Sequence, residues 1–255
     1  MHKLDVIERF SDRVADYVRY RPDYPPALTH WLHHAWNVTP AWAVADVGAG
    51  TGISSKLFLD AGHPVIAVEP NAPMRAAAEQ WLGQRERFRT VDGRADATGL
   101  PDASVDLVSV AQAFHWFDPE AARREFRRIL RAEGLAAIYW NSRRLTGTAF
   151  LEGYEALLLR HGTDYSSVAE RYADDAAMRT WFGDGFRGAA RFEHGQRLDF
   201  DGLRGRLLSS SYAPKADHSS HAPMLRALRE LFDRCAVDGT ISFDYDTRIF
   251  VGRMG

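Results

Sequence analysis

The sequence predicts an α/β fold in which a mostly parallel, seven-stranded sheet carries helices on both faces and a helical cap. Two observations predict it. Short apolar stretches alternate with helical ones from residue 41 to residue 142, which favours a parallel sheet with right-handed crossovers. A glycine-rich turn at 48–52 joins the first strand to a helix, as in sheets that bind a ligand at their carboxyl edge.

The first part of the chain supplies five strands. A helix is expected at 4–20, where apolar residues recur at helical spacing. The prolines of 21–26 end it, and a second helix follows at roughly 26–36. Strands are then expected at 41–47, 64–70, 88–93, 104–113 and 135–142, with helices at 53–62, 71–83 and 118–134.

The ends of these helices carry recognisable signals. Asn71 and Asp118 are expected as N-caps, because a short polar side chain there accepts from free backbone N–H groups. Gly62 and Gly134 are expected to close their helices, since glycine adopts the left-handed conformation common at that point.

The pattern changes after residue 142. A broken helical stretch is followed by a sixth strand at 190–200, two helices and a seventh strand at 241–254, which is rich in β-branched and aromatic residues. No linker divides the chain, so we expect one domain. We divide it into N-terminal cap helices, a cofactor-binding core, a helical cap insertion and the C-terminal part of the sheet, at 1–36, 37–142, 143–185 and 186–255.

Composition restricts the function. The 255 residues are 45% hydrophobic and 26% charged, with a net charge of −2, so no bulk field draws the chain to nucleic acid or an anionic membrane. The single cysteine, Cys235, excludes an internal disulfide. No apolar leader and no run of about 18 apolar residues is present. We expect a cytoplasmic protein with a small-molecule partner and leave its oligomeric state open.

The turn "DVGAGTG", residues 46–52, allows three interpretations. A phosphate-binding loop would need a lysine that is absent at the required spacing, and a dinucleotide-binding turn would need glycine where Ile53 stands. The third interpretation is Asp-x-Gly-x-Gly-x-Gly, which resembles motif I of class I S-adenosylmethionine-dependent methyltransferases. That resemblance implies a Rossmann-like fold and S-adenosylmethionine as cofactor. It assigns cofactor contacts to Asp46, Gly48, Ala49, Gly50 and Gly52.

Two further stretches resemble the same family. Glu69 and Pro70 end the second strand, 19 residues past Gly50, where an acid reaches the ribose hydroxyls in such folds. In "DGRADATGL", Asp96 and Ala97 match the place where an acid and a small residue face the adenine. The family resemblance covers roughly residues 40–142.

The stretch "AQAFHWFDP", residues 111–119, leaves the fourth strand at the edge where the methyl donor is expected. Gln112 is a candidate cofactor contact. His115 and Trp116 are candidate catalytic residues, because a histidine can take a proton near neutral pH and an aromatic ring attracts a cation. The alternative for His115 is a histidine that bonds a carbonyl and fixes the loop, and the alternative for Trp116 is ordinary packing. The "HWFD" segment is similar to trans-aconitate methyltransferases and their relatives.

Residues near the amino terminus and late in the chain complete the candidate site. Tyr20 and Arg21 are expected to hold the methionyl carboxylate, since a guanidinium matches a carboxylate. The serines and tyrosine of 209–212 fall where the family builds acceptor pockets.

No histidine and acid spacing predicts a metal site. The predicted activity is methyl transfer to a small molecule. The alternatives are a cofactor-binding protein without transfer activity and a nicotinamide-dependent oxidoreductase.

Overall fold

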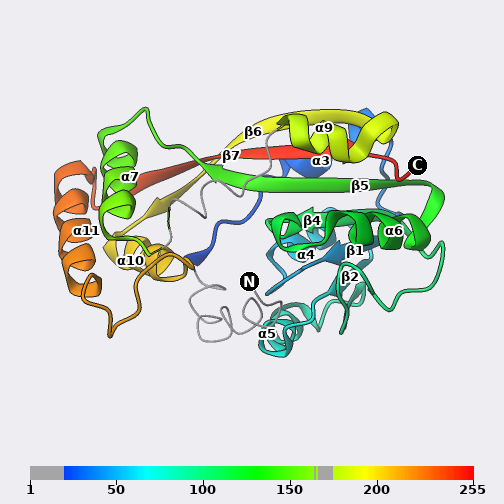
Figure 1. The fold of residues 1–255 in the computed structure, drawn as a ribbon, viewed down its shortest axis with the longest axis horizontal. Coiled ribbons are helices and arrows are strands. Elements are labelled where there is room, and N and C mark those ends of the chain that lie inside the picture. Colours follow the sequence, from blue (N-terminus) through cyan, green and yellow to red (C-terminus); the bar gives the residue numbers. More distant parts are fainter. Residues whose placement is uncertain (1–19, 164, 166–174) are drawn as a thin grey trace.

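A seven-stranded sheet forms the centre of the computed structural model, which describes residues 20–163, 165 and 175–255 (Figure 1). The strand order is β3-β2-β1-β4-β5-β7-β6. Among these strands only β7 runs in the opposite direction, pairing antiparallel with β5 and β6, which confirms the predicted mostly parallel sheet. The strands are β1 (Val44–Val47), β2 (Val65–Val68), β3 (Phe88–Val91), β4 (Val105–Ala111), β5 (Leu130–Arg143), β6 (Phe186–Leu198) and β7 (Ile241–Gly252).

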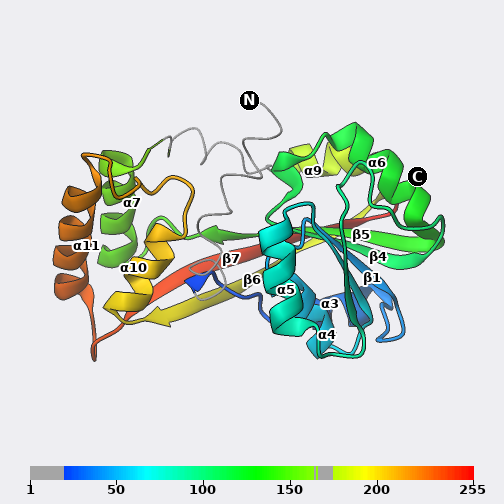
Figure 2. The same cartoon turned by 90° about the horizontal axis from the view of Figure 1, so that it is seen from below.

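Helices cover both faces of the sheet (Figure 2). On one face α3 (Ala27–Trp36), α4 (Ile53–Asp60) and α5 (Ala72–Leu82) pack through apolar side chains onto the strands. On the other, α6 (Pro119–Ile129) and α9 (Asp175–Phe182) do the same. Consecutive residues of β5 alternate between these two clusters, as the two-residue period of a strand requires. The sheet is therefore buried on both faces.

The predicted caps open their helices, and one predicted helix end is wrong. Asn71 accepts from the N–H of Met74, and Asp118 caps α6 in the same way. The helix expected to run to Gly134 ends at Ile129, and β5 begins at once. Leu130 already pairs with Val105, while the residues after it bulge out before pairing resumes at Leu135.

A lobe of three helices lies beyond the carboxyl ends of β5 and β6 (Figure 1). It consists of α7 (Ala149–His161), α10 (Phe200–Leu208) and α11 (His221–Cys235), which share one core with the adjoining end of β7. The strands β5, β6 and β7 have 14, 13 and 12 residues, against four in β1. Their extra length carries them past the parallel core to the lobe.

The lobe is composed differently from the expected insertion at 143–185. Of the helices described in that range, α7 joins the lobe, whereas α9 packs against the sheet because Met178, Trp181 and Phe182 are buried in the cluster around α6. The helices α10 and α11 come instead from the segment assigned to the sheet. The expected helix at 4–20 lies outside the described residues except for Tyr20.

Candidate active site

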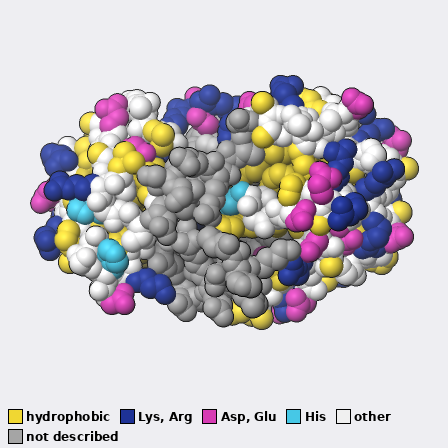
Figure 3. Space-filling model, in the orientation of Figure 1, with side chains coloured by type: hydrophobic (Ala, Val, Ile, Leu, Met, Phe, Trp, Pro, Cys, Tyr) yellow, Lys and Arg dark blue, Asp and Glu magenta, His cyan; other side chains and the backbone are white. Residues whose placement is uncertain are grey.

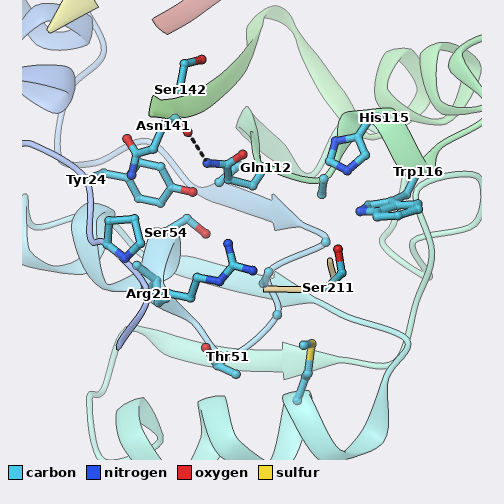
Figure 4. Close-up of a pocket in the computed structure, with 18 of the residues that line it drawn as sticks. Arg21, Tyr24, Thr51, Ser54, Gln112, His115, Trp116, Asn141, Ser142 and Ser211 are labelled. Atoms are coloured by element: carbon cyan, nitrogen blue, oxygen red, sulfur yellow. Dashed lines mark hydrogen bonds between the residues drawn. The ribbon is translucent and has the colours of Figure 1, made fainter. Parts of the chain in front are cut away.

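A cavity of about 450 Å³ opens between the carboxyl edge of the sheet and the lobe. Figure 4 shows Arg21, Gln112, His115 and Ser211 arranged around the same space. Several of its walls were expected from the sequence, namely the glycine turn, the end of β2 and the loop after β4. Others come from the ends of β5 and β7, from α7 and from α10.

The three glycines of the turn serve different purposes. All have positive φ, at 72° for Gly48, 57° for Gly50 and 90° for Gly52, a region that favours glycine. A Cβ on Gly48 would lie 2.7 Å from Ala113, and one on Gly52 would lie 2.8 Å from Leu82, so packing also requires glycine there. A Cβ on Gly50 would meet only Met74, at 3.8 Å. Gly50 therefore leaves open space in the cavity.

Asp46 does not line the cavity, contrary to the expected cofactor contact. Its carboxylate is fully buried and accepts hydrogen bonds from the hydroxyls of Ser54 and Ser55, at 2.6 Å each, and of Ser109 at 3.2 Å. Burial raises the pKa of Asp46, and the hydroxyl donors oppose that rise. Two of the donors lie in the first turn of α4, so Asp46 fixes the helix that follows the glycine turn. Gly52 likewise lies outside the lining, while Ala49 belongs to it.

The carboxylate of Glu69 faces the glycine turn. One oxygen accepts from the N–H of Gly50 and the other from the N–H of Asn71, both at 2.9 Å. Glu69 is 8% exposed and lines the cavity together with Pro70. Burial raises its pKa, and the two N–H donors oppose that rise. A carboxylate has about four acceptor positions, so Glu69 can still accept from a ligand.

The loop after β4 brings three predicted residues to the cavity. Gln112 has φ of 56°, and its side-chain amide donates to the carbonyl of Asn141 at 3.1 Å. A non-glycine residue in this region is strained, and such strain collects at functional sites. The rings of His115 and Trp116 lie 4.6 Å apart in a short 3₁₀ helix, η1 (Phe114–Trp116), and both line the cavity.

Of the predicted pair Tyr20 and Arg21, only Arg21 lines the cavity. Arg21 lines the cavity and donates to the carbonyl of Ser209 at 3.0 Å. Tyr20 does not line it, because its ring packs against Gly205 of α10, where a Cβ would lie 2.3 Å away. Arg21 thus joins the amino-terminal segment to the lobe at the cavity, and Tyr20 anchors that segment.

Asp96 and Ala97 also lie outside the cavity lining. Asp96 is exposed and forms a two-point ion pair with Arg94, at 3.0 and 3.2 Å. The backbone of this loop is held by Glu125 of α6, which accepts from the N–H and the hydroxyl of Thr98. The adenine contact expected of Asp96 stays a prediction.

Sequence reasoning missed several polar residues of the cavity. Thr51 is 1% exposed, and its hydroxyl has no hydrogen-bond partner among the residues that the structure describes. Thr51 follows Gly50 directly, so its position in the glycine turn could have predicted a place in the cavity. Ser54, in the first turn of α4, also follows the glycine turn. The others come from segments without a motif; they are Asn141, Ser142, Arg143, Glu155, Tyr165, Arg206 and Tyr245. Of the predicted serine segment, Ser211 and Tyr212 face the cavity.

The described part of the chain has neither a metal-binding cluster nor a helix that could span a membrane. No cluster of three or more histidine, cysteine, aspartate or glutamate side chains that could hold a metal ion occurs in 20–163, 165 and 175–255. Within the same ranges, no helix has the length and apolar character needed to cross a bilayer.

Known methyltransferases resemble this chain in sequence. Residues 45–138 match the methyltransferase domain family. The chain is 39% identical over 141 residues to an uncharacterised methyltransferase of Mycobacterium tuberculosis, covering 55% of each chain. It is 35% identical over 174 residues to a methyltransferase-like protein of Schizosaccharomyces pombe, covering 66% of this chain and 65% of the relative. The chain thus spans between about half and two thirds of these relatives.

Solved structures extend the likeness over most of the chain. A candidate type II methyltransferase from Anaeromyxobacter dehalogenans superposes with a TM-score of 0.69 at 26% identity, over 92% of this chain and 98% of that one. Geranyl diphosphate methyltransferase in complex with S-adenosylmethionine shares the fold, with a TM-score of 0.51 at 13% identity over 90% and 85% of the two chains. These likenesses support a class I S-adenosylmethionine-dependent methyltransferase.

Proposed function

We propose that this protein transfers a methyl group from S-adenosylmethionine to a small-molecule acceptor. The observation that carries the proposal is that Gly50 and Glu69 are hydrogen-bonded to each other and line the same cavity. Open space over a glycine turn and a carboxylate with spare acceptor positions together suit a nucleoside. The likeness of residues 45–138 to methyltransferase domains argues against the nicotinamide-dependent alternative.

The residues present fit the cofactor. Glu69 would accept from the ribose hydroxyls, and the Thr51 hydroxyl, buried without a described partner, would gain one from the ligand. The space over Gly50 would admit the nucleoside close to the backbone. Arg21 would hold the methionyl carboxylate, and Gln112 would border the reacting centre. Asp96 would reach the adenine only by sharing its carboxylate with Arg94.

When bound, S-adenosylmethionine supplies a methyl group that is already strongly electrophilic. The protein then has to align the acceptor for in-line attack and exclude water. His115 and Trp116 lie where the loop after β4 meets the cavity. His115 takes the proton of the acceptor when the attacking group carries one, and Trp116 presents an aromatic face to positive charge.

The size and charge of the molecule support a small acceptor. A cavity of about 450 Å³ suits a metabolite-sized ligand. On the face shown in Figure 3 basic and acidic side chains are interspersed, and the α6 residue Arg128 pairs with Glu125 and Asp102. We therefore propose neither nucleic acid nor membrane as partner.

The free thiol of Cys235 fits a cytoplasmic location. The likeness of the His115 loop to trans-aconitate methyltransferases stays a prediction.

Calorimetric titration with S-adenosylhomocysteine tests the cofactor assignment. Gly50→Leu places side-chain atoms in the cavity and should lower affinity by about 100-fold or more. Gly183→Leu is the matched control, because Gly183 has φ of 55°, is exposed, and would place its Cβ in open space. It carries the same backbone strain at a distance from the site. Undiminished binding by Gly50→Leu, or tighter binding of a nicotinamide dinucleotide, would refute the proposal.

Radiolabelled methyl transfer separates an enzyme from a binding protein. Wild-type protein should move label from S-adenosylmethionine into a metabolite extract, and Gly50→Leu should not. Binding without transfer into any extract would identify a cofactor-binding protein instead.

A further inference from the structure

Arg206 is a buried cation at the end of the cavity formed by the lobe. It is 5% exposed, lies on α10 and lines the cavity. Its Nε donates to the hydroxyl of Tyr245 at 2.9 Å, and its Nη1 donates to the hydroxyl of Ser210 at 2.9 Å. The guanidinium also lies over the ring of Phe243, 5.5 Å from its centre. These contacts hold the side chain in place but do not neutralise its charge.

No carboxylate among the described residues forms an ion pair with Arg206, and its Nη2 makes no hydrogen bond to any of them. A second arginine in the same cavity shows the contrast. Arg143 forms an ion pair with Glu155 and donates to the hydroxyl of Tyr165 at 2.8 Å. Burying a charge without an opposite charge is costly. The cost at Arg206 is explained if a ligand supplies the missing anion.

A charge count assigns the anion to the acceptor. Three arginines and two glutamates line the cavity, namely Arg21, Arg143, Arg206, Glu69 and Glu155. The carboxylate of Glu69 accepts from two backbone N–H groups at the glycine turn. Glu155 neutralises Arg143. Under the proposed function, Arg21 is matched by the methionyl carboxylate of the cofactor. Arg206 is left, with one positive charge to be balanced.

We infer that the methyl acceptor is a small molecule bearing a carboxylate, and that Arg206 binds this carboxylate through Nη2. The inference rests on the proposed function. A carboxylate fits better than a phosphate, because one uncompensated guanidinium balances a single negative charge and its planar fork matches a carboxylate. The hydroxyls of Ser211 and Tyr212, which also line the cavity, lie in the segment that follows α10 and can donate to the ligand. The carboxylate is the anchor, and another group of the acceptor takes the methyl.

Fractionation of a metabolite extract by charge tests the class of acceptor. The extract is divided on an anion exchanger at pH 7, and each fraction is incubated with the protein and S-adenosylmethionine labelled in the methyl group. We expect label to enter the retained fraction only, and to do so equally after treatment with alkaline phosphatase. Label from the unbound fraction in a product that has no carboxylate, or loss of the acceptor after phosphatase treatment, would overturn the carboxylate while leaving methyl transfer intact. Absence of transfer from both fractions would refute the proposed function and this inference with it.

Substitution of Arg206 tests the anchor directly. Arg206→Met should lower kcat/KM for the retained acceptor by about 100-fold, as loss of one partner of a buried charge pair does. Its affinity for S-adenosylhomocysteine should stay within about two-fold of wild type, because the hydrogen bonds of Arg206 go to Tyr245 and Ser210 and not to the glycine turn or Glu69. Arg204→Met, an exposed arginine on the same helix, is the matched control and should behave as wild type.

Arg206→Lys covers the case in which Arg206→Met does not fold. It keeps the charge but loses the planar fork, so KM for the acceptor should rise by about ten-fold while kcat changes little. An unchanged KM in Arg206→Lys, or full activity in a folded Arg206→Met, would overturn the inference.

Discussion

The two ends of the cavity are built in different ways. At the end around Gly50 and Glu69 the ligand meets backbone amides, a glycine turn and one carboxylate, all from short consecutive stretches at the carboxyl edge of the parallel strands. At the end around Arg206 it meets side chains from β5, β7, α7 and α10, which are far apart in the sequence. The first end depends on backbone conformation and the second on how four elements pack together.

This difference suggests that one end of the cavity binds the cofactor and the other recognises the acceptor. A cofactor common to a family can be held by a turn whose geometry any member can reproduce, since backbone groups are the same in every sequence. An acceptor that differs between members has to be recognised by side chains. The lobe of α7, α10 and α11 supplies such side chains without changing the sheet beneath it.

The largest effect is expected for His115, which lies between the cofactor end and the acceptor end of the cavity. His115→Ala should lower turnover by about 10²–10⁴-fold, the contribution of a general base. Affinity for S-adenosylhomocysteine and the melting temperature should stay near wild type. The measurements are labelled methyl transfer, calorimetry and thermal unfolding. A parallel fall in cofactor affinity and melting temperature would instead mean that His115 shapes the loop. A rate within about three-fold of wild type would mean that the acceptor arrives deprotonated.

A smaller effect is expected at the cofactor end. Glu69→Ala should weaken binding of S-adenosylhomocysteine by about 1.5–3 kcal/mol, the range for hydrogen bonds to a charged group. Asp92→Ala removes an exposed carboxylate just after β3 and is the matched control. Equal affinities in wild type and Glu69→Ala would make Glu69 a structural residue that only orders the turn.

The same contact should depend on pH. The ionised carboxylate is the better acceptor, so affinity should be full above the pKa of Glu69 and decline as the pH falls through it. Because burial raises that pKa above 4.5, the decline should begin at a higher pH than for an ordinary glutamate. Glu69→Gln should remove this dependence. A raised pKa means that the folded protein takes up the proton more readily than the unfolded chain, so protonation of Glu69 favours folding. Loss of binding is then distinguishable from acid unfolding.

Most of the fold could be predicted, because its signals are local. Alternating apolar strands and capped helices lie within single stretches of sequence, and the caps at Asn71 and Asp118 follow from one side chain each. The junction of α6 and β5 could not be predicted, since Leu130 leaves the helix to pair with Val105, a partner 25 residues away. The prediction of which helices form the lobe was wrong for the same reason. Helix α7 is separated in the sequence from α10 and α11 by α9 and β6, and the three helices pack together only in the folded chain.

The candidate site divides in the same way. The turn and Glu69 could be found from residue type and spacing, although spacing could not show that Asp46 turns inward to three serines. Arg206 carried no signal, because an arginine in an ordinary helical stretch looks like a solvated side chain. Only packing of α10 against β7 buries it.

The smallest effect concerns the part of the cofactor end that the structure leaves outside the cavity. Asp96→Ala should weaken S-adenosylhomocysteine by about 0.5–1.5 kcal/mol, the worth of one ordinary hydrogen bond, if its carboxylate accepts from the adenine amine. An analogue with a purine lacking that amine should bind both proteins equally. Arg94→Ala is the control, because it frees Asp96 from its ion pair and should preserve or strengthen binding. Equal losses for both ligands would assign Asp96 to holding its loop, and the adenine would then depend on neighbouring backbone alone.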